Sequence, residues 1–158
     1  MCDNYNNDKG DSEEVNSFTI WTTNHSIPIQ TTYYHCQAYS MNFNEKIHIT
    51  RLKPRINYEN KLFVHHILLF LCPLGLDDDS LKWSGDCYSS YPNKITPNNL
   101  TNCEQVFFIG GWAFGGKDFI FPAEAGFPLN PGTSYFLFQI HYNNMNLIPF
   151  IDSVGYEM

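Results

Sequence analysis

The chain has 158 residues, which is enough for one domain with its own hydrophobic core. Apolar residues make up 43% and aromatic residues 16% of the chain, and this richness in large β-forming side chains argues against disorder and against a helical bundle. The formal net charge is −7, and the Lys and Arg residues are scattered. Because no basic cluster is present to displace counterions from phosphates, we expect no nucleic-acid partner.

Residues 1–16 are polar and rich in Asn and Asp, so we expect a disordered N-terminus followed by one domain at residues 17–158. In that domain, short β-prone runs alternate with sequences rich in Gly, Pro and Asn, which favour turns. The predicted strands are Phe18–Trp21, Thr31–Ala38, Lys46–Leu52, Leu62–Cys72, Gln105–Trp112, Phe119–Phe121 and Ser134–Tyr142. No segment shows a helical period, so the pattern predicts an all-β protein, an antiparallel sandwich or barrel.

The five cysteines contain no CxxC pair, which a zinc knuckle usually needs. Cys36, Cys72, Cys87 and Cys103 are spread over a β-rich chain, which favours two disulfides and an oxidising compartment. Four cysteines allow three pairings, and Cys2 is left over. The long polar stretch from residue 76 to 102 contains Cys87 and precedes Cys103, so disulfides are expected to hold it down.

Two sequons, at Asn24 and Asn99, are candidates for glycosylation and agree with a secretory route. The first 15 residues have no apolar signal-peptide core. The apolar run at residues 62–72 is too short to span a bilayer and contains two histidines, so no membrane span is expected. We interpret the chain as a fragment of a longer protein of the secretory lumen, secretory vesicles or the extracellular space.

Two adjacent histidines, His65 and His66, lie in a predicted apolar strand, where each imidazole needs a polar partner. Adjacent side chains on a regular strand point to opposite faces, so a shared metal ion requires a twist or bulge there. The alternative is one buried, hydrogen-bonded histidine and one exposed histidine.

A third histidine lies on the strand at residues 134–142. Alternation places Phe136, Phe138, Ile140 and Tyr142 on one face and Tyr135, Leu137, Gln139 and His141 on the other. His65, His66 and His141 together form an all-imidazole ligand set that suits zinc or copper. His25, His35 and His48 lie in polar or loop-like sequence and are expected to be surface or capping residues.

Three smaller features favour structural interpretations, and a fourth favours a role beside the metal site. Trp112 is expected to be buried with its N–H bonded. The acids at residues 77–79 lack the alternating spacing of a calcium loop and predict a solvated turn. Glu124 is interpreted as a loop residue, and Gln139, on the face of His141, as a supporting group for a metal ligand.

Ordered motifs along some 120 positions carry a family resemblance. They are Thr31-Thr32-Tyr33-Tyr34-His35-Cys36, Val64-His65-His66, Ser84-Gly85-Asp86-Cys87, Asn102-Cys103, Gly111-Trp112-Ala113-Phe114-Gly115-Gly116, Phe121-Pro122-Ala123-Glu124-Ala125-Gly126 and Gln139-Ile140-His141-Tyr142-Asn143-Asn144. Through them the chain resembles the N-terminal domain of the copper type II, ascorbate-dependent monooxygenases, which include the dopamine β-monooxygenase group.

The resemblance implies a jelly-roll-like β-sandwich with disulfides Cys36–Cys87 and Cys72–Cys103. It also implies that the three histidines bind the copper ion that receives electrons from ascorbate. The family's second domain supplies another copper ion, where O2 and a small aromatic amine bind. We expect that domain to lie outside this chain, and the end of the first domain to be truncated, with an unpaired sheet edge.

The function expected for the parent protein is ascorbate-dependent hydroxylation of a C–H bond in a phenylethylamine-like substrate with O2. The chain alone is expected to be inactive. The alternatives are a non-catalytic copper-binding module and, more remotely, a zinc hydrolase with a three-histidine site, for which no general base is evident.

Overall fold

The computed structural model describes residues 16–73, 75–88, 96–103, 107–122 and 124–158. In chain order its elements are β1 (Thr19–Trp21), β2 (His25–Ile27), β3 (Thr32–Phe43), β4 (Ile47–Ile49), β5 (Arg51–Ile56), β6 (Val64–Cys72), α1 (Asp78–Lys82), β7 (Ser84–Asp86), α2 (Asn98–Cys103), β8 (Phe107–Ala113), β9 (Phe119–Ile120), β10 (Phe127–Leu129), β11 (Gly132–Asn143), β12 (Phe150–Asp152) and β13 (Val154–Glu157). The predicted N-terminal disorder at residues 1–16 lies almost entirely outside the described residues.

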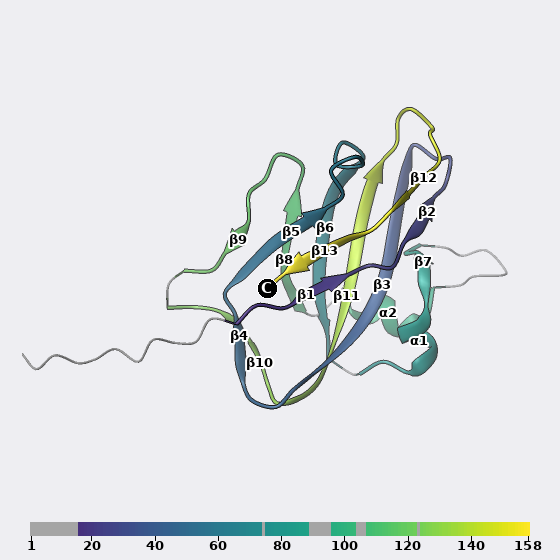
Figure 1. Ribbon diagram of the computed structural model, residues 1–158. Coiled ribbons are helices and arrows are strands. Elements are labelled where there is room, and N and C mark those ends of the chain that lie inside the picture. The colour runs from purple at the N-terminus through teal and green to yellow at the C-terminus, as the bar shows by residue number, and fades with distance from the viewer. Residues whose placement is uncertain (1–15, 74, 89–95, 104–106, 123) are drawn as a thin grey trace, which may run out of the picture.

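Two antiparallel sheets form the sandwich (Figure 1). One has the strand order β7-β3-β11-β6-β8 and the other β1-β13-β5-β9, while β10-β4 and β12-β2 are two-stranded ribbons. The all-β fold class predicted from the sequence is confirmed.

The main core contains apolar side chains from both sheets. The face of β11 that carries Phe136, Phe138, Ile140 and Tyr142 is fully buried in it, as the alternation predicted. The second face of the five-stranded sheet is covered at one end by α1 and α2, where Leu137 and Leu100 are buried. At its other end this outer face carries His141.

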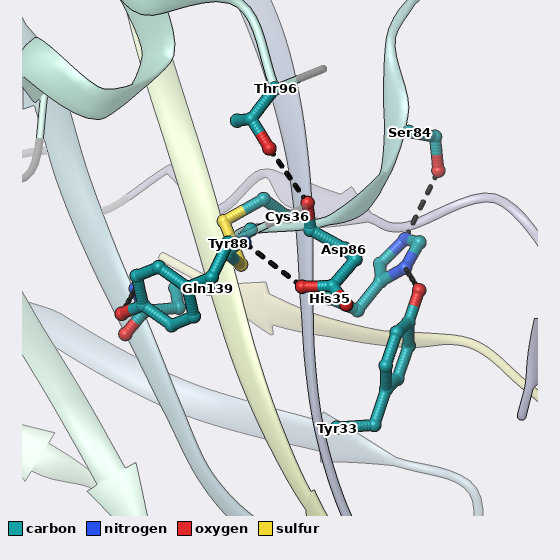
Figure 2. Close-up of a disulfide and its surroundings, with 9 residues drawn as sticks. Tyr33, His35, Cys36, Ser84, Asp86, Tyr88, Thr96 and Gln139 are labelled. Carbon is teal, nitrogen blue, oxygen red and sulfur yellow. Dashed lines mark hydrogen bonds between the residues drawn. A yellow bond between two sulfur atoms is a disulfide. The ribbon is translucent and has the colours of Figure 1, made fainter. Parts of the chain in front are cut away.

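Both disulfides implied by the family resemblance are present, Cys36–Cys87 and Cys72–Cys103. The first joins β3 to the turn after β7, and Figure 2 shows its surroundings. The second joins the end of β6 to α2. All four cysteines are buried in the cluster on the outer face, so the bridges hold the segment after β6 against that sheet.

The strand prediction was wrong mainly for short elements. It missed β2, β7, β10, β12 and β13, and it treated α1 and α2 as loop. These elements have three to six residues, too few to show a period, and their partners are distant in sequence. The acids at residues 77–79 begin α1, where Asp77 Oδ1 accepts a hydrogen bond from Ser80 N at 2.7 Å.

Residues 150–157, at the end of the chain, are part of the sandwich. β13 lies between β1 and β5, and it pairs with both of them. The truncation expected at the end of the first domain stays a prediction. Within the described ranges, no helix has the length and apolar character needed to cross a bilayer.

Candidate metal centre

The register of the five-stranded sheet aligns two of the three histidines. His141 on β11 lies directly opposite His66 on β6 and, on its other side, opposite Tyr34 on β3. Directly opposed residues of antiparallel strands share a face of the sheet. Tyr34, His141 and His66 therefore form a row across the outer face, where both imidazoles are partly exposed.

A β-bulge brings the third histidine to the same place. β11 pairs His141 with His66 and then Tyr142 with Val64, so His65 is the extra residue on β6. The His65 carbonyl still accepts a hydrogen bond from Phe114 N at 2.8 Å, which holds the bulge on the side of β8. The bulge that a shared site requires is thus present, with His65 exposed and His66 partly buried.

The three imidazoles converge through their Nδ1 atoms. Nδ1 of His65 lies 3.1 Å from Nδ1 of His66 and 3.2 Å from Nδ1 of His141. One potential ligand nitrogen from each ring lies within 4.8 Å of the other two. His65 is exposed, so the cluster is open to solvent on one side.

These short contacts fit a metal ligand set better than a hydrogen-bonded set. A ring nitrogen carries either one hydrogen or one lone pair, so Nδ1 of His65 cannot form good hydrogen bonds to both neighbours. Metal–imidazole bonds of about 2.0 Å, at angles of roughly 90–120°, separate two donor nitrogens by about 2.8–3.5 Å. The donor set of three imidazoles therefore fits a transition metal such as copper or zinc.

Burial keeps two of the imidazoles in the form that binds metals. Burial, and then the neighbouring His65, lower the pKa of His66 below its usual value. Burial, and then His66 and His65, lower the pKa of His141 to about 4. Both rings are neutral at pH 7, and a neutral imidazole keeps the lone pair that a metal ion needs.

Aromatic packing positions the ring of His141. Its Nε2 is buried and has no hydrogen-bond partner among the described residues. Tyr34 stacks on the ring, with centroids 4.3 Å apart and an interplanar angle of 2°. Tyr88 packs edge-on against Tyr34, at 5.2 Å between centroids, and its hydroxyl accepts a hydrogen bond from Gln139 Nε2 at 3.0 Å (Figure 2). Gln139 is 5% exposed, so it is a buried residue that supports this aromatic pair.

Two of the remaining histidines are not surface residues, and this corrects the prediction. His25 and His35 are buried, and their rings stack with centroids 3.6 Å apart. Polar sequence around them indicated exposure, whereas hydroxyl and carbonyl groups inside the fold satisfy their nitrogens. Thr23 and Tyr33 are two positions away along the chain, and Tyr142 and Ser84 come from distant strands. His48, in contrast, is exposed as predicted.

The smaller predictions have mixed outcomes. Trp112 is only partly buried, but its Nε1–H donates to the carbonyl of Gly116 at 2.9 Å, as expected. Glu124 is exposed in the loop between β9 and β10. Asn24 is exposed between β1 and β2, whereas the side chain of Asn99 lies outside the described residues.

The fold and the site define a β-sandwich, linked by two disulfides, with a candidate three-imidazole metal centre. A family model described as copper type II ascorbate-dependent monooxygenase, N-terminal domain, matches residues 18–149. The chain belongs to this family.

Individual relatives agree with the family model. The DBH-like monooxygenase protein 1 of Homo sapiens is 37% identical over 123 residues, 75% of this chain and 19% of that protein. The tyramine beta-hydroxylase of Caenorhabditis briggsae is 35% identical over 126 residues, 77% of this chain and 20% of the relative. The dopamine beta-hydroxylase of Homo sapiens is 34% identical over 128 residues, 79% of this chain and 20% of the relative. The chain spans about a fifth of the length of these curated relatives.

Proposed function

We propose that this domain binds one copper ion through His65, His66 and His141 and passes electrons from ascorbate within a longer monooxygenase. In the parent protein these electrons support hydroxylation of a C–H bond of a phenylethylamine-like amine with O2. Family membership supports the use of copper and ascorbate. The names of the hydroxylase relatives support the amine substrate.

The observation that carries the proposal is the convergence of three Nδ1 atoms around the bulge at His65. When bound, copper supplies one-electron redox chemistry at this point. The three rings bring no negative charge to it, so neither oxidation state is strongly favoured by the ligands alone. The exposed side chain of His65 leaves the site accessible to a small reductant from solvent.

A copper titration of the chain with both disulfides intact tests the ligand set. We expect one copper ion per chain in the unchanged protein and loss of stoichiometric copper in His141→Ala. His48→Ala is the matched control, because it removes an exposed imidazole outside the cluster and is expected to keep the full copper content. Unchanged copper content in a folded His141→Ala variant would refute the assignment.

Ascorbate separates the redox interpretation from a hydrolytic zinc site. We expect ascorbate to abolish the electron paramagnetic resonance signal of the copper-loaded chain. A site that binds zinc tightly, rejects copper and does not respond to ascorbate would support the zinc interpretation instead.

The second candidate is a copper-binding module without catalytic activity, and the small share of the relatives' length that the chain spans favours testing it. We expect the chain alone to bind copper but not to hydroxylate tyramine or dopamine. Turnover by the chain alone would contradict this expectation. The same assay on a longer gene product would distinguish a domain of an active enzyme from a non-catalytic module.

We further propose that the chain functions in the secretory pathway. Both disulfides lie in the buried cluster on the outer face, and such bridges persist in oxidising compartments. Intact disulfides in protein recovered from the secretory lumen would support this location, and fully reduced cysteines in the native cell would contradict it.

A further inference from the structure

A second polar cluster lies between the β2–β12 ribbon and the five-stranded sheet, away from the candidate metal centre. His25 on β2 and Asp152 on β12 are register partners in the two-stranded ribbon. The hydroxyl of Tyr142, on β11, lies 3.0 Å from Nε2 of His25 and 3.0 Å from Oδ2 of Asp152. Asp152 and Tyr142 are 1% and 0% exposed, and His25 is 8% exposed, so water does not readily take over these contacts.

The hydrogen atoms in this series of hydrogen bonds can be counted. Nδ1 of His25 lies 2.9 Å from the carbonyl oxygen of Thr23, which can only accept, so this nitrogen carries a hydrogen. The Tyr142 hydroxyl has one hydrogen and two neighbours at 3.0 Å. If it donates to Asp152, then Nε2 of His25 must donate to it, and the imidazole is positively charged. If it donates to His25, then the Asp152 carboxyl must carry a hydrogen.

Both arrangements contain one proton more than a neutral imidazole beside an ionised carboxylate. We propose that His25 and Asp152 form a buried site that holds a single proton at neutral pH, with the Tyr142 hydroxyl as the bridge. The site joins the β2–β12 ribbon to β11 at the residue next to His141. Retention of the proton therefore holds this ribbon against the strand that carries a candidate metal ligand.

The surroundings favour a shared proton over free charges. Asn60 Nδ2 donates to Asp152 Oδ1 at 2.8 Å. The ring of His35, on β3, stacks on His25, and its two nitrogens face the hydroxyls of Tyr33 and Ser84 (Figure 2). Each of these hydroxyls can donate or accept a hydrogen bond.

Two further groups bear on the charge of the site. Burial, and then the nearby charge of Asp86 on β7, raise the pKa of Tyr33 to about 12. Burial and the Asp152 carboxylate raise the pKa of Tyr142 well above its usual value, so the bridge stays protonated. Burial lowers the pKa of His25, while the hydrogen bond to the Thr23 carbonyl and the Asp152 carboxylate oppose this shift.

The sign of the pH dependence follows from the proton count. Above about pH 6.5 an unfolded His–Asp pair holds no proton, whereas the folded site holds one. The folded state then binds one proton more, so stability is lost as pH rises, until the folded site releases its proton. One proton corresponds to a tenfold rise in the unfolding equilibrium constant per pH unit. Between about pH 4 and 6.5 both states hold one proton, and the site contributes no slope.

Chemical unfolding of the metal-free, disulfide-intact chain between pH 6.5 and 9 tests the proposal. Tyr142→Phe removes the bridge and keeps the ring. Tyr156→Phe is the matched control, because its buried hydroxyl donates to the carbonyl of Ile67 at 2.9 Å and also bonds the backbone of Trp112, and neither backbone group titrates. Relative to the unchanged chain, we expect Tyr142→Phe to lose about a tenfold-per-pH-unit slope and Tyr156→Phe to keep it. Equal slopes in all three proteins would overturn the proposal.

A measurement on the unchanged chain avoids dependence on the folding of any variant. The ring nitrogens of His25 and the carboxyl carbon of Asp152 can be followed by nuclear magnetic resonance at pH 7 and above. We expect either a doubly protonated His25 or a protonated Asp152, with both signals changing together in one step at higher pH. A neutral His25 beside an ionised Asp152 at pH 7 would overturn the proposal.

Discussion

The two histidine clusters of this domain differ in what their ring nitrogens face. In the cluster of His65, His66 and His141, the Nδ1 atoms face one another at 3.1 and 3.2 Å. In the cluster of His25 and His35, each ring nitrogen faces an oxygen of a carbonyl or hydroxyl group. In the first arrangement Nδ1 of His65 cannot form good hydrogen bonds to both neighbours, whereas in the second each nitrogen has a partner.

Burial alone would have suggested the opposite assignment. The imidazoles of the second cluster are the more buried ones, yet their nitrogens are already occupied and offer no lone pair to a metal ion. The candidate ligands are more exposed and face each other around a β-bulge. Free lone pairs that converge on one point therefore identify the metal site better than histidine burial does.

The largest expected effect is a loss of folding stability when the polar contacts of His25, Tyr142 and Asp152 are broken. Asp152→Ala removes a buried acceptor that the Tyr142 hydroxyl and the Asn60 amide share, so we expect the free energy of unfolding to fall by about 3 kcal/mol. Asp118→Ala is the control, because it removes a more exposed carboxylate paired with Arg51, and it is expected to cost less than about 1 kcal/mol. Urea unfolding measures both, and equal losses would remove the energetic contrast between buried and exposed carboxylates.

The next effect concerns copper affinity rather than stability. Tyr34→Ala removes the ring that stacks on His141, and we expect copper binding to weaken about tenfold, the lower range for groups that orient a metal ligand. Tyr34→Phe keeps the ring and is expected to bind copper like the unchanged chain. A competition titration with a chelator of known affinity measures the difference. Full affinity in Tyr34→Ala would show that the ring does not position His141.

A smaller effect is the pH dependence of stability that His141 gives to the metal-free chain. Because the pKa of His141 is lowered to about 4, the unfolded state binds more protons than the folded state between about pH 4 and 6.5. The metal-free chain should therefore lose stability as pH falls through this window. His141→Ala should show a weaker loss in thermal unfolding between pH 7 and 5. An identical loss in both proteins would show that His141 does not titrate as its surroundings require.

The smallest expected effect on stability comes from Asn24, an exposed residue next to the buried His25. Asn24 and Ser26 are exposed while His25 between them is buried. We propose that Asn24 carries a glycan when the chain passes through the secretory pathway. Asn24→Gln should remove a glycosidase-sensitive mobility shift and change stability by less than about 0.5 kcal/mol. A shift that persists in the variant would assign the glycan elsewhere, for example to Asn99.

Local sequence patterns predicted the long strands and their faces. The alternation along residues 134–142 correctly separated the core face from the face of Gln139 and His141. The short strands β12 and β13 were missed because three or four residues carry no clear period. The exposure of His25 was predicted wrongly because its partner Tyr142 lies 117 positions away in the chain.

By itself, the sequence determined the β-sandwich class, the two faces of β11 and, through ordered motifs, the family. These properties depend on neighbouring residues and on the period of two along a strand. Only the tertiary structure decided that His65 is the bulged residue and that His25 contacts Tyr142 beside Asp152. Register and bulges arise from pairing between strands, and the protonation of a buried histidine depends on groups that only the folded chain brings together.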